Sequence, residues 1–475
     1  MSDLDLCYMS AAEALAGFRA KSLSPVDLMG AVIARCEEVN PSLNAFTYTF
    51  FERALEQSRT AEQRYAAGEA RALEGLPLAI KDFHAVAGEI TTLGSKIFEH
   101  NRTERSAPTV ARLLDAGAIM HCRSTTPEFA HAPATRSPLW GVTRNPWNLD
   151  YTPGGSSGGA GAALAAGMTF LADGTDAGGS VRIPASASGV VGYKAPFGRN
   201  PLDRDHPLES LLHYGPMTRS VGDAALMQNV MSGAHPEDMC SLRDEMVIPE
   251  QLDGIKGWKI ALSMDLGFFE VAPEVRERTL QAAETFRALG CTVEEVALDW
   301  SYDIHDPYLQ YWEGMAATTL AQYLPEWRDR MDPYMAGIIE NGAGHTAATQ
   351  YRCNLVRGQM YEALAPILER YDVMICPALS VPAVKAEHDL ADPDFEINGK
   401  PTEAYLGWNM CYPFNMVSQC PVMCVPNGFC PETGVPIGLQ IAGRTFDDLS
   451  VFRAASAFEA AQPPLYNKQQ NRPAL

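Results

Sequence analysis

The sequence lacks the features that would point to a membrane protein or a secreted protein. It has no uninterrupted apolar run of about 18 residues, which is the length that a membrane-spanning helix needs. Its first residues, MSDLDLCYMSAAEALAGF, have neither the basic start nor the apolar core of a signal peptide. We therefore expect a cytoplasmic protein.

Positive charge is also scarce. The 475 residues include 37 Lys and Arg against 58 Asp and Glu, so the formal net charge is −21. Nucleic-acid surfaces need clustered Lys and Arg, and anionic membranes attract basic segments. The composition therefore disfavours both nucleic acid and membrane as partners.

Cysteines are present, but without a pattern that would bind metal. The 11 cysteines follow no spacing rule, which is typical of free thiols in a reducing compartment. A loose group near the C-terminal end consists of Cys411, Cys420, Cys424 and Cys430. Because paired C-x-x-C knuckles with partner histidines are missing, we expect no metal site there.

Short apolar segments alternate with helical patterns along the chain. Strands are predicted at 76–80, 119–122 and 373–376, and helices at 25–36, 50–67, 108–115 and from Asp447 to about Pro463. Such alternation predicts an α/β fold with a largely buried sheet. We expect one compact unit over residues 1–475, with a variable lobe rich in aromatic residues at about 240–410.

Two clusters of glycine and serine carry the strongest chemical signal. The first, residues 154–158 (GGSSG), satisfies the G-x-S-x-G pattern of a nucleophile elbow around Ser156, and residues 155–159 satisfy it again around Ser157. That elbow needs a strand directly before it, whereas residues 145–153 are rich in turns and contain two prolines. No P-loop lysine or complete dinucleotide fingerprint follows, so we expect no cofactor. A glycine-rich turn and an esterase of the α/β-hydrolase type that uses Ser156 stay as alternatives.

The second cluster, residues 174–180 (GTDAGGS), suggests a site for a developing negative charge. We expect the backbone N–H groups of Ala177, Gly178, Gly179 and Ser180 to line one concave wall, and each such donor contributes about 3 kcal/mol to an oxyanion. A serine inside this wall is well placed to attack a carbonyl carbon. Asp176 and Arg182 carry opposite charges on either side, and we expect them to form a structural pair.

A serine nucleophile needs a base, and Lys81 is the candidate. None of the 10 histidines lies in a motif with the two clusters. Lys81 follows the predicted strand at 76–80, where burial would lower its pKa and leave it neutral. The alternative is an ion pair between Lys81 and the adjacent Asp82.

Together these motifs resemble the amidase signature family. The block from Gly154 to Lys194 fits that signature closely, and the similarity extends to residues 44–45, 126–129, 141–148, 215–220, 434–440 and 443. One departure is residues 194–197 (KAPF), where the family more often has Lys-Pro-Thr. The resemblance implies a single α/β domain with a mixed sheet covered by helices on both faces, a signature core at 74–230 and a variable substrate-binding lobe at about 240–410.

The resemblance also implies roles for individual residues. It places Ser180 as the nucleophile, Ser156 as the serine that relays protons after a cis peptide bond, and Lys81 as the base. It also implies that Ser157, Thr175, Asp176 and Arg182 support the site without reacting. The implied reaction is amide hydrolysis through an acyl-enzyme, without a metal or a cofactor.

The substrate is expected to be a small amide. The aromatic residues of the variable lobe, with Trp140 and Tyr151 near the signature, suggest an apolar or aryl group, so anilides, carbamates and related esters are the leading expectations. The alternative is a glutamine-hydrolysing component of a tRNA-charging amidotransferase, which the net charge disfavours. A membrane-anchored lipid-amide hydrolase is disfavoured because no N-terminal anchor is present. We expect a monomer or a homodimer.

Overall fold

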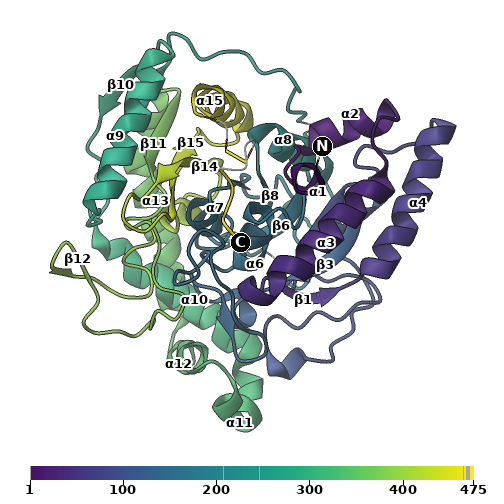
Figure 1. Cartoon of the computed structure of the whole chain (residues 1–475). Coiled ribbons are helices and arrows are strands. Elements are labelled where there is room, and N and C mark those ends of the chain that lie inside the picture. The colour runs from purple at the N-terminus through teal and green to yellow at the C-terminus, as the bar shows by residue number, and fades with distance from the viewer. Residues whose placement is uncertain (1, 207, 245, 464, 467–470) are drawn as a thin grey trace.

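The computed structural model describes residues 2–475 except 207, 245, 464 and 467–470. A mixed eleven-stranded sheet runs through the molecule, with helices on both faces (Figure 1). In spatial order its strands are β1 (Phe46–Thr49), β3 (Ile119–Ser124), β2 (Pro77–Lys81), β6 (Leu171–Asp176), β8 (His213–Thr218), β7 (Val191–Lys194), β14 (Val422–Phe429), β15 (Pro436–Ala442), β11 (Val373–Pro377), β9 (Lys259–Leu262) and β10 (Thr292–Glu295). The predicted α/β fold is confirmed.

The strands are parallel in two places and antiparallel between them. β3, β2 and β6 are parallel to one another, as are β11, β9 and β10, whereas the strands from β6 to β11 alternate in direction. Because β2 and β6 are parallel neighbours, their carboxyl ends lie at the same edge of the sheet. Two short pairs lie outside this sheet: β4 (Arg136–Ser137) with β5 (Gly141–Val142), and β12 (Glu396–Ile397) with β13 (Lys400–Pro401).

The helices surround this sheet (Figure 1). They are α1 (Asp3–Cys7), α2 (Ala11–Arg19), α3 (Pro25–Leu43), α4 (Phe51–Ala67), α5 (Pro108–Asp115), α6 (Gly158–Ala165), α7 (Arg182–Ser188), α8 (Val221–Met231), α9 (Pro273–Ala288), α10 (His305–Leu320), α11 (Leu324–Trp327), α12 (Pro333–Gly342), α13 (Ala347–Arg370), α14 (Pro413–Met416) and α15 (Asp448–Ala461). The helices predicted from the sequence are confirmed to within a few residues, except that α3 continues to Leu43. Within the described residues, no helix has both the length and the apolarity to cross a membrane.

The helix ends follow the local chemistry of the sequence. Ser24 caps α3 by accepting a hydrogen bond from the N–H of Val26, with a proline in the first turn. Helix α4 ends at Gly68, whose φ of +77° is a conformation that glycine adopts without strain. Asp447 caps α15 through the N–H of Ser450.

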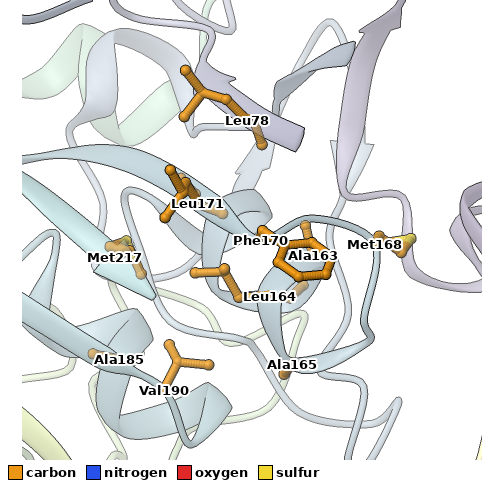
Figure 2. Close-up of a cluster of buried hydrophobic side chains, with 14 of the residues drawn as sticks. Leu78, Ala163, Leu164, Ala165, Met168, Phe170, Leu171, Ala185, Val190 and Met217 are labelled. Atoms are coloured by element: carbon orange, nitrogen blue, oxygen red, sulfur yellow. The ribbon is translucent and has the colours of Figure 1, made fainter. Parts of the chain in front are cut away.

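Helix α6 follows the first glycine- and serine-rich cluster and packs closely against the sheet. Every one of its residues is buried, and apart from Leu164 it contains only glycine and alanine. A side chain at Gly159 would meet the backbone of Thr125 at 2.4 Å, so a bulkier residue would push the helix away from β3. Figure 2 shows Leu164 among Phe170, Leu171 and other apolar side chains that fill the space beside this helix.

The region at 240–410, which was expected to form a substrate-binding lobe, contributes to two different parts of the structure. Strands β9, β10 and β11 and helix α9 extend the central sheet and its cover. Helices α10, α11 and α12 lie together at the lower end of the molecule in Figure 1. The boundaries of the signature core and of the lobe stay predictions.

Candidate active site

Lys81 lies at the carboxyl end of β2, buried between the neighbouring strands β3 and β6. Its side chain is 0% exposed. The Nζ atom lies 2.7 Å from Ser156 Oγ, 2.7 Å from Thr175 Oγ1 and 2.9 Å from Ser157 Oγ. The expectation that a buried strand delivers Lys81 to the serines is therefore confirmed.

The alternative ion pair between Lys81 and Asp82 is not found in the structure. The Asp82 carboxylate accepts hydrogen bonds from the N–H and the hydroxyl of Thr92 and lies 3.7 Å from Arg123 Nη2. Asp82 lies in the turn just after β2, where Thr92 and Arg123 are its partners instead of Lys81.

Burial decides the protonation of Lys81. Loss of hydration lowers the pKa of Lys81 to about 7, although the carboxylates of Asp173 and Asp176 favour the ammonium form. The three groups that touch Nζ are uncharged hydroxyls. A substantial fraction of Lys81 is therefore neutral at neutral pH and able to accept a proton.

Ser156 lies in the loop before α6 and is fully buried. The peptide bond Gly155–Ser156 is cis, as predicted. Residues 145–155 form no strand, so the strand–turn–helix context of a nucleophile elbow is missing. The burial of Ser156 and its contact with Lys81 favour a role in proton relay over a role as the attacking atom.

Ser180 lies in the turn between β6 and α7, and its side chain is open to a cavity. Among the described residues, the Ser180 hydroxyl has no hydrogen-bond partner, and it lines two adjoining recesses. The backbone carbonyl of Ser180 accepts a hydrogen bond from the N–H of Ser157 at 3.1 Å. This bond ties the turn of Ser180 to the loop that carries Ser156.

The predicted oxyanion wall needs one correction. The N–H of Gly179 donates to Asp176 Oδ1 at 2.7 Å, so it is not free for a ligand. Gly179 has a φ of +107°, a conformation that glycine adopts without strain. Within the described part of the chain, the N–H groups of Ala177, Gly178 and Ser180 donate to no other residue.

The expected pair between Asp176 and Arg182 is present and holds this turn in place. Both side chains are fully buried, and Arg182 Nε and Nη2 each lie 2.9 Å from an oxygen of Asp176. Although burial alone would raise the pKa of Asp176, Arg182 and Asn415 hold it well below its usual range. The guanidinium also donates to Gln440 Oε1 and Asn415 Oδ1, so Arg182 has a structural role.

A cavity of about 340 Å³ opens above Ser180. Its aromatic lining consists of Phe83, Phe98, Phe129, Tyr308, Tyr311, Trp312 and Tyr323. Trp140 and Tyr151, which the sequence suggested for the pocket, do not line it. The indole N–H of Trp140 donates instead to Thr92 Oγ1 at 3.0 Å. A narrower recess of about 30 Å³ adjoins the cavity at Ser180.

Several residues that shape the site carry no signal in the sequence. The hydroxyl of Tyr308 donates to the carbonyl of Ala177 at 3.3 Å, and Asn409 Nδ2 donates to the carbonyl of Gly178 at 2.8 Å. Both donors lie more than a hundred residues away along the chain, and neither belongs to a motif. Because such contacts depend on the packing of distant elements, only the structure reveals them.

Among the described residues, no group of three or more His, Cys, Asp or Glu side chains is arranged to hold a metal ion.

A sheet with a buried lysine that contacts two consecutive serines, beside a third serine in a glycine-rich turn, is the arrangement of amidase signature hydrolases. The Amidase family model matches residues 27–452. The chain therefore belongs to the amidase signature family of hydrolases, which act on carbon–nitrogen bonds.

Individual relatives agree with this assignment. An acylamidase of Rhodococcus erythropolis is 35% identical over 98% of this chain and 97% of its own length. The solved structure of a bacterial aryl acylamidase of the same family superposes with a TM-score of 0.90, at 31% identity over 96% of both chains. A glutamyl-tRNA(Gln) amidotransferase subunit from Geobacter metallireducens is 32% identical over 93% of this chain and 94% of its own length.

Proposed function

We propose that this protein hydrolyses small amides that carry an apolar or aryl group, with Ser180 as the nucleophile, Ser156 as the proton relay and Lys81 as the base. The observation that carries the proposal is the 2.7 Å contact between Lys81 Nζ and Ser156 Oγ, together with the hydrogen bond from the N–H of Ser157 to the carbonyl of Ser180, which lines the cavity. Serine is a weak nucleophile unless a nearby base accepts its proton.

The first half of the reaction forms an acyl-enzyme. Ser180 Oγ bonds to the carbonyl carbon while its proton passes to Ser156 Oγ, and Ser156 gives its own proton to neutral Lys81. The carbonyl oxygen becomes an oxyanion, for which the free N–H groups of Ala177, Gly178 and Ser180 are the available donors. The C–N bond then breaks, and the relay returns one proton to the leaving nitrogen. The products of this half are an amine and an ester on Ser180.

The second half repeats the proton transfers with water. Water gives one proton to the relay as its oxygen attacks the ester carbon, and the bond between that carbon and Ser180 Oγ breaks. The relay returns the proton to Ser180 Oγ. A carboxylic acid leaves, and all three residues regain their starting protonation.

The cavity supports an aryl or apolar substrate. Seven aromatic side chains line it, and none of the described lining residues is Lys or Arg. Aromatic rings bind a flat apolar group by stacking and by removing it from water. The relatives include an acylamidase and an aryl acylamidase. We therefore propose anilides as the leading class and carbamates as the next, because a carbamate presents a similar carbonyl carbon to Ser180.

Glutamine hydrolysis is the second candidate, supported by the similarity to a glutamyl-tRNA(Gln) amidotransferase subunit. Glutamine carries an α-carboxylate, which an enzyme binds most strongly with a cationic side chain. The described lining of the cavity offers Asp203, Asp205 and Glu209 but no Lys or Arg. The cavity therefore favours the neutral aryl amide.

Turnover by the purified chain tests the proposal. We expect release of aniline from acetanilide, with slower cleavage of ethyl N-phenylcarbamate and no ammonia from glutamine. Ammonia from glutamine without aniline from acetanilide would instead support the amidotransferase function. The same preparation, analysed by light scattering, tests the proposed monomeric or homodimeric state.

A further inference from the structure

Two fully buried side chains lie beside Lys81 and take no part in the steps above. Asp173 of β6 and His84 of the turn after β2 are both 0% exposed. Asp173 Oδ1 accepts the backbone N–H of Lys81 at 2.7 Å, and its Oδ2 lies 3.5 Å from His84 Nε2. In the described structure, Asp173 Oδ2 and both ring nitrogens of His84 have no hydrogen-bond partner of good geometry, although the backbone of Gly174 lies near enough to the ring to raise the pKa of His84. Unpartnered polar atoms thus gather directly behind the proposed base.

Physical chemistry selects one arrangement of this pair. A buried polar atom without a partner is costly, and Asp173 Oδ2, 3.5 Å from His84 Nε2, is an acceptor within reach of that nitrogen. Burial, together with the positive charges of Lys81 and Arg123, lowers the pKa of His84 well below its usual value. His84 is therefore neutral, with one N–H that it can donate to the carboxylate.

The strand geometry places the side chain of Asp173 on the same face of the sheet as Lys81 Nζ. Side chains two residues apart on a strand lie on the same face, and Asp173 precedes Thr175 by two positions on β6. Thr175 Oγ1 lies 2.7 Å from Lys81 Nζ. The Asp173 carboxylate therefore shares the face on which Lys81 Nζ lies.

We propose, on the basis of the function proposed above, that Asp173 and His84 form a positioning pair for Lys81. His84 Nε2–H donates to Asp173 Oδ2 and keeps the carboxylate ionised. The negative charge of Asp173 then stabilises a proton on Lys81 Nζ and keeps this buried amine basic enough to accept the proton of Ser156.

The other charged groups around Lys81 have partners of their own. Asp176, farther along β6, is paired with Arg182. On β3, Arg123 donates to the carbonyls of Lys81 and His84 and lies 3.7 Å from Asp82.

Two more histidines belong to these surroundings. His206 stacks on Phe83 on the cavity side, and the ring of His213, on β8, lies near Asp176. Burial raises the pKa of Asp173 to about 7, even though the N–H of Lys81 and the charge of Arg123 lower it. A hydrogen bond from His84 would favour the ionised form.

The proposed role has a kinetic signature that a structural role lacks. A base is most effective when its pKa is near the working pH, and burial alone would make Lys81 too weak. Loss of the Asp173 charge should lower the pKa of Lys81. The enzyme would then keep its activity at lower pH, but its plateau rate would fall because the base is weaker.

Asp173→Asn, which conserves shape, tests this signature. Two rates are measured from pH 5 to 9: turnover of 4-nitroacetanilide, and covalent labelling of Ser180 by a fluorophosphonate. We expect the acid limb of both profiles to move about one unit toward lower pH, the size typical of removing one nearby charge, with a plateau about threefold lower. His84→Leu should move the limb in the same direction, and His84→Gln, which retains a donor near the position of Nε2, should restore it.

Asp223→Asn is the matched control. Asp223 is also a buried carboxylate, but it accepts the N–H groups of Ala11 and Ala12 far from Lys81, so its loss should leave the limb in place. An unmoved limb in folded Asp173→Asn, shown by circular dichroism, would overturn the inference. Lys81→Met in parallel separates the two hypotheses, because labelling and turnover that persist without Lys81 would refute the proposed function itself.

Discussion

The regions around Lys81 and Lys194 each contain one fully buried lysine, and their difference shows what makes such a residue useful. Both side chains are 0% exposed, and burial lowers the pKa of each to about 7. Lys81 Nζ touches three hydroxyls, whereas Lys194 Nζ donates to the backbone carbonyls of Cys420 at 2.7 Å and Ser418 at 3.4 Å.

The partners, rather than the pKa, separate the two lysines. A hydroxyl both donates and accepts, so it can pass a proton to a neutral amine, whereas a carbonyl only accepts. Lys194 therefore ties β7 to the segment before β14. A shifted pKa identifies a candidate site, and the neighbouring groups decide whether chemistry takes place there.

The largest expected effect is the difference in turnover between a variant of Ser180, in the Lys81 region, and a variant of Ser418, in the Lys194 region. Ser180→Ala should reduce turnover of an anilide by about 10⁴-fold or more, because the attacking oxygen is lost. Ser418→Ala removes a hydroxyl near Lys194 that accepts from Arg357 at 2.9 Å, and it should leave turnover within about twofold. Steady-state kinetics on 4-nitroacetanilide and mass spectrometry of the fluorophosphonate adduct measure both. An adduct on Ser156 in the wild-type protein would instead support the elbow mechanism.

The next largest effect is the difference in kcat between variants of Lys81 and Lys194. Lys81→Met should lower kcat by about 10³-fold, since it removes the general base. Lys194→Met should spare kcat but lower the free energy of unfolding by about 1–3 kcal/mol, because the carbonyls of Cys420 and Ser418 lose a donor. Urea unfolding and kcat measured on the same samples give both quantities. Equal losses of kcat in the two variants would remove the distinction between the regions.

The sequence predicted the parts of the Lys81 region that depend on local pattern. The apolar run ending at Ile80 predicted a buried strand before Lys81, and the glycine-rich clusters indicated turns that place Ser156 and Ser180. Resemblance to the amidase signature supplied the contact between Lys81 and Ser156 and the cis peptide bond, both of which the structure reproduces. Periodicity alone would not have brought three such distant segments together.

What could not be predicted depends on contacts between distant elements. The carbonyl partners of Lys194 come from residues more than two hundred positions later. The use of the Gly179 N–H by Asp176 depends on the dihedral angles of one turn. The cavity is lined by Tyr308 and Trp312 rather than by Trp140. No local sequence motif predicts that α10 packs near Ser180.

The pH dependence of activity sharpens the comparison, since only one of the two lysines should control it. Lys81 acts as a base only when neutral, and its pKa is about 7. We expect kcat/KM for 4-nitroacetanilide to fall about tenfold for each pH unit below about 7. The profile of Lys194→Met should follow the same curve. A rate that stays constant from pH 8 down to 5 would rule out Lys81 as the base.

Stability should respond to both lysines equally. Each has a pKa of about 7 in the folded protein, against about 10.4 when unfolded. Between pH 7 and 8 the unfolded chain binds more protons, so stability rises with pH, by up to about 1.4 kcal/mol per unit for each lysine. Urea unfolding at the two pH values should show a smaller rise in Lys81→Met and in Lys194→Met than in the wild type. Unchanged slopes in both variants would contradict the lowered pKa values.

The smallest effect concerns the aromatic cavity, which adjoins the Lys81 region and has no counterpart at Lys194. Trp312→Ala should raise KM for an anilide about tenfold, because a large apolar contact surface is lost, and should leave the acid limb in place. Trp327→Ala is the control, since Trp327 lies against Arg330 and does not line the cavity. If Trp312→Ala lowers kcat and leaves KM unchanged, Trp312 affects the transition state, and the cavity wall belongs to the chemistry rather than to substrate binding.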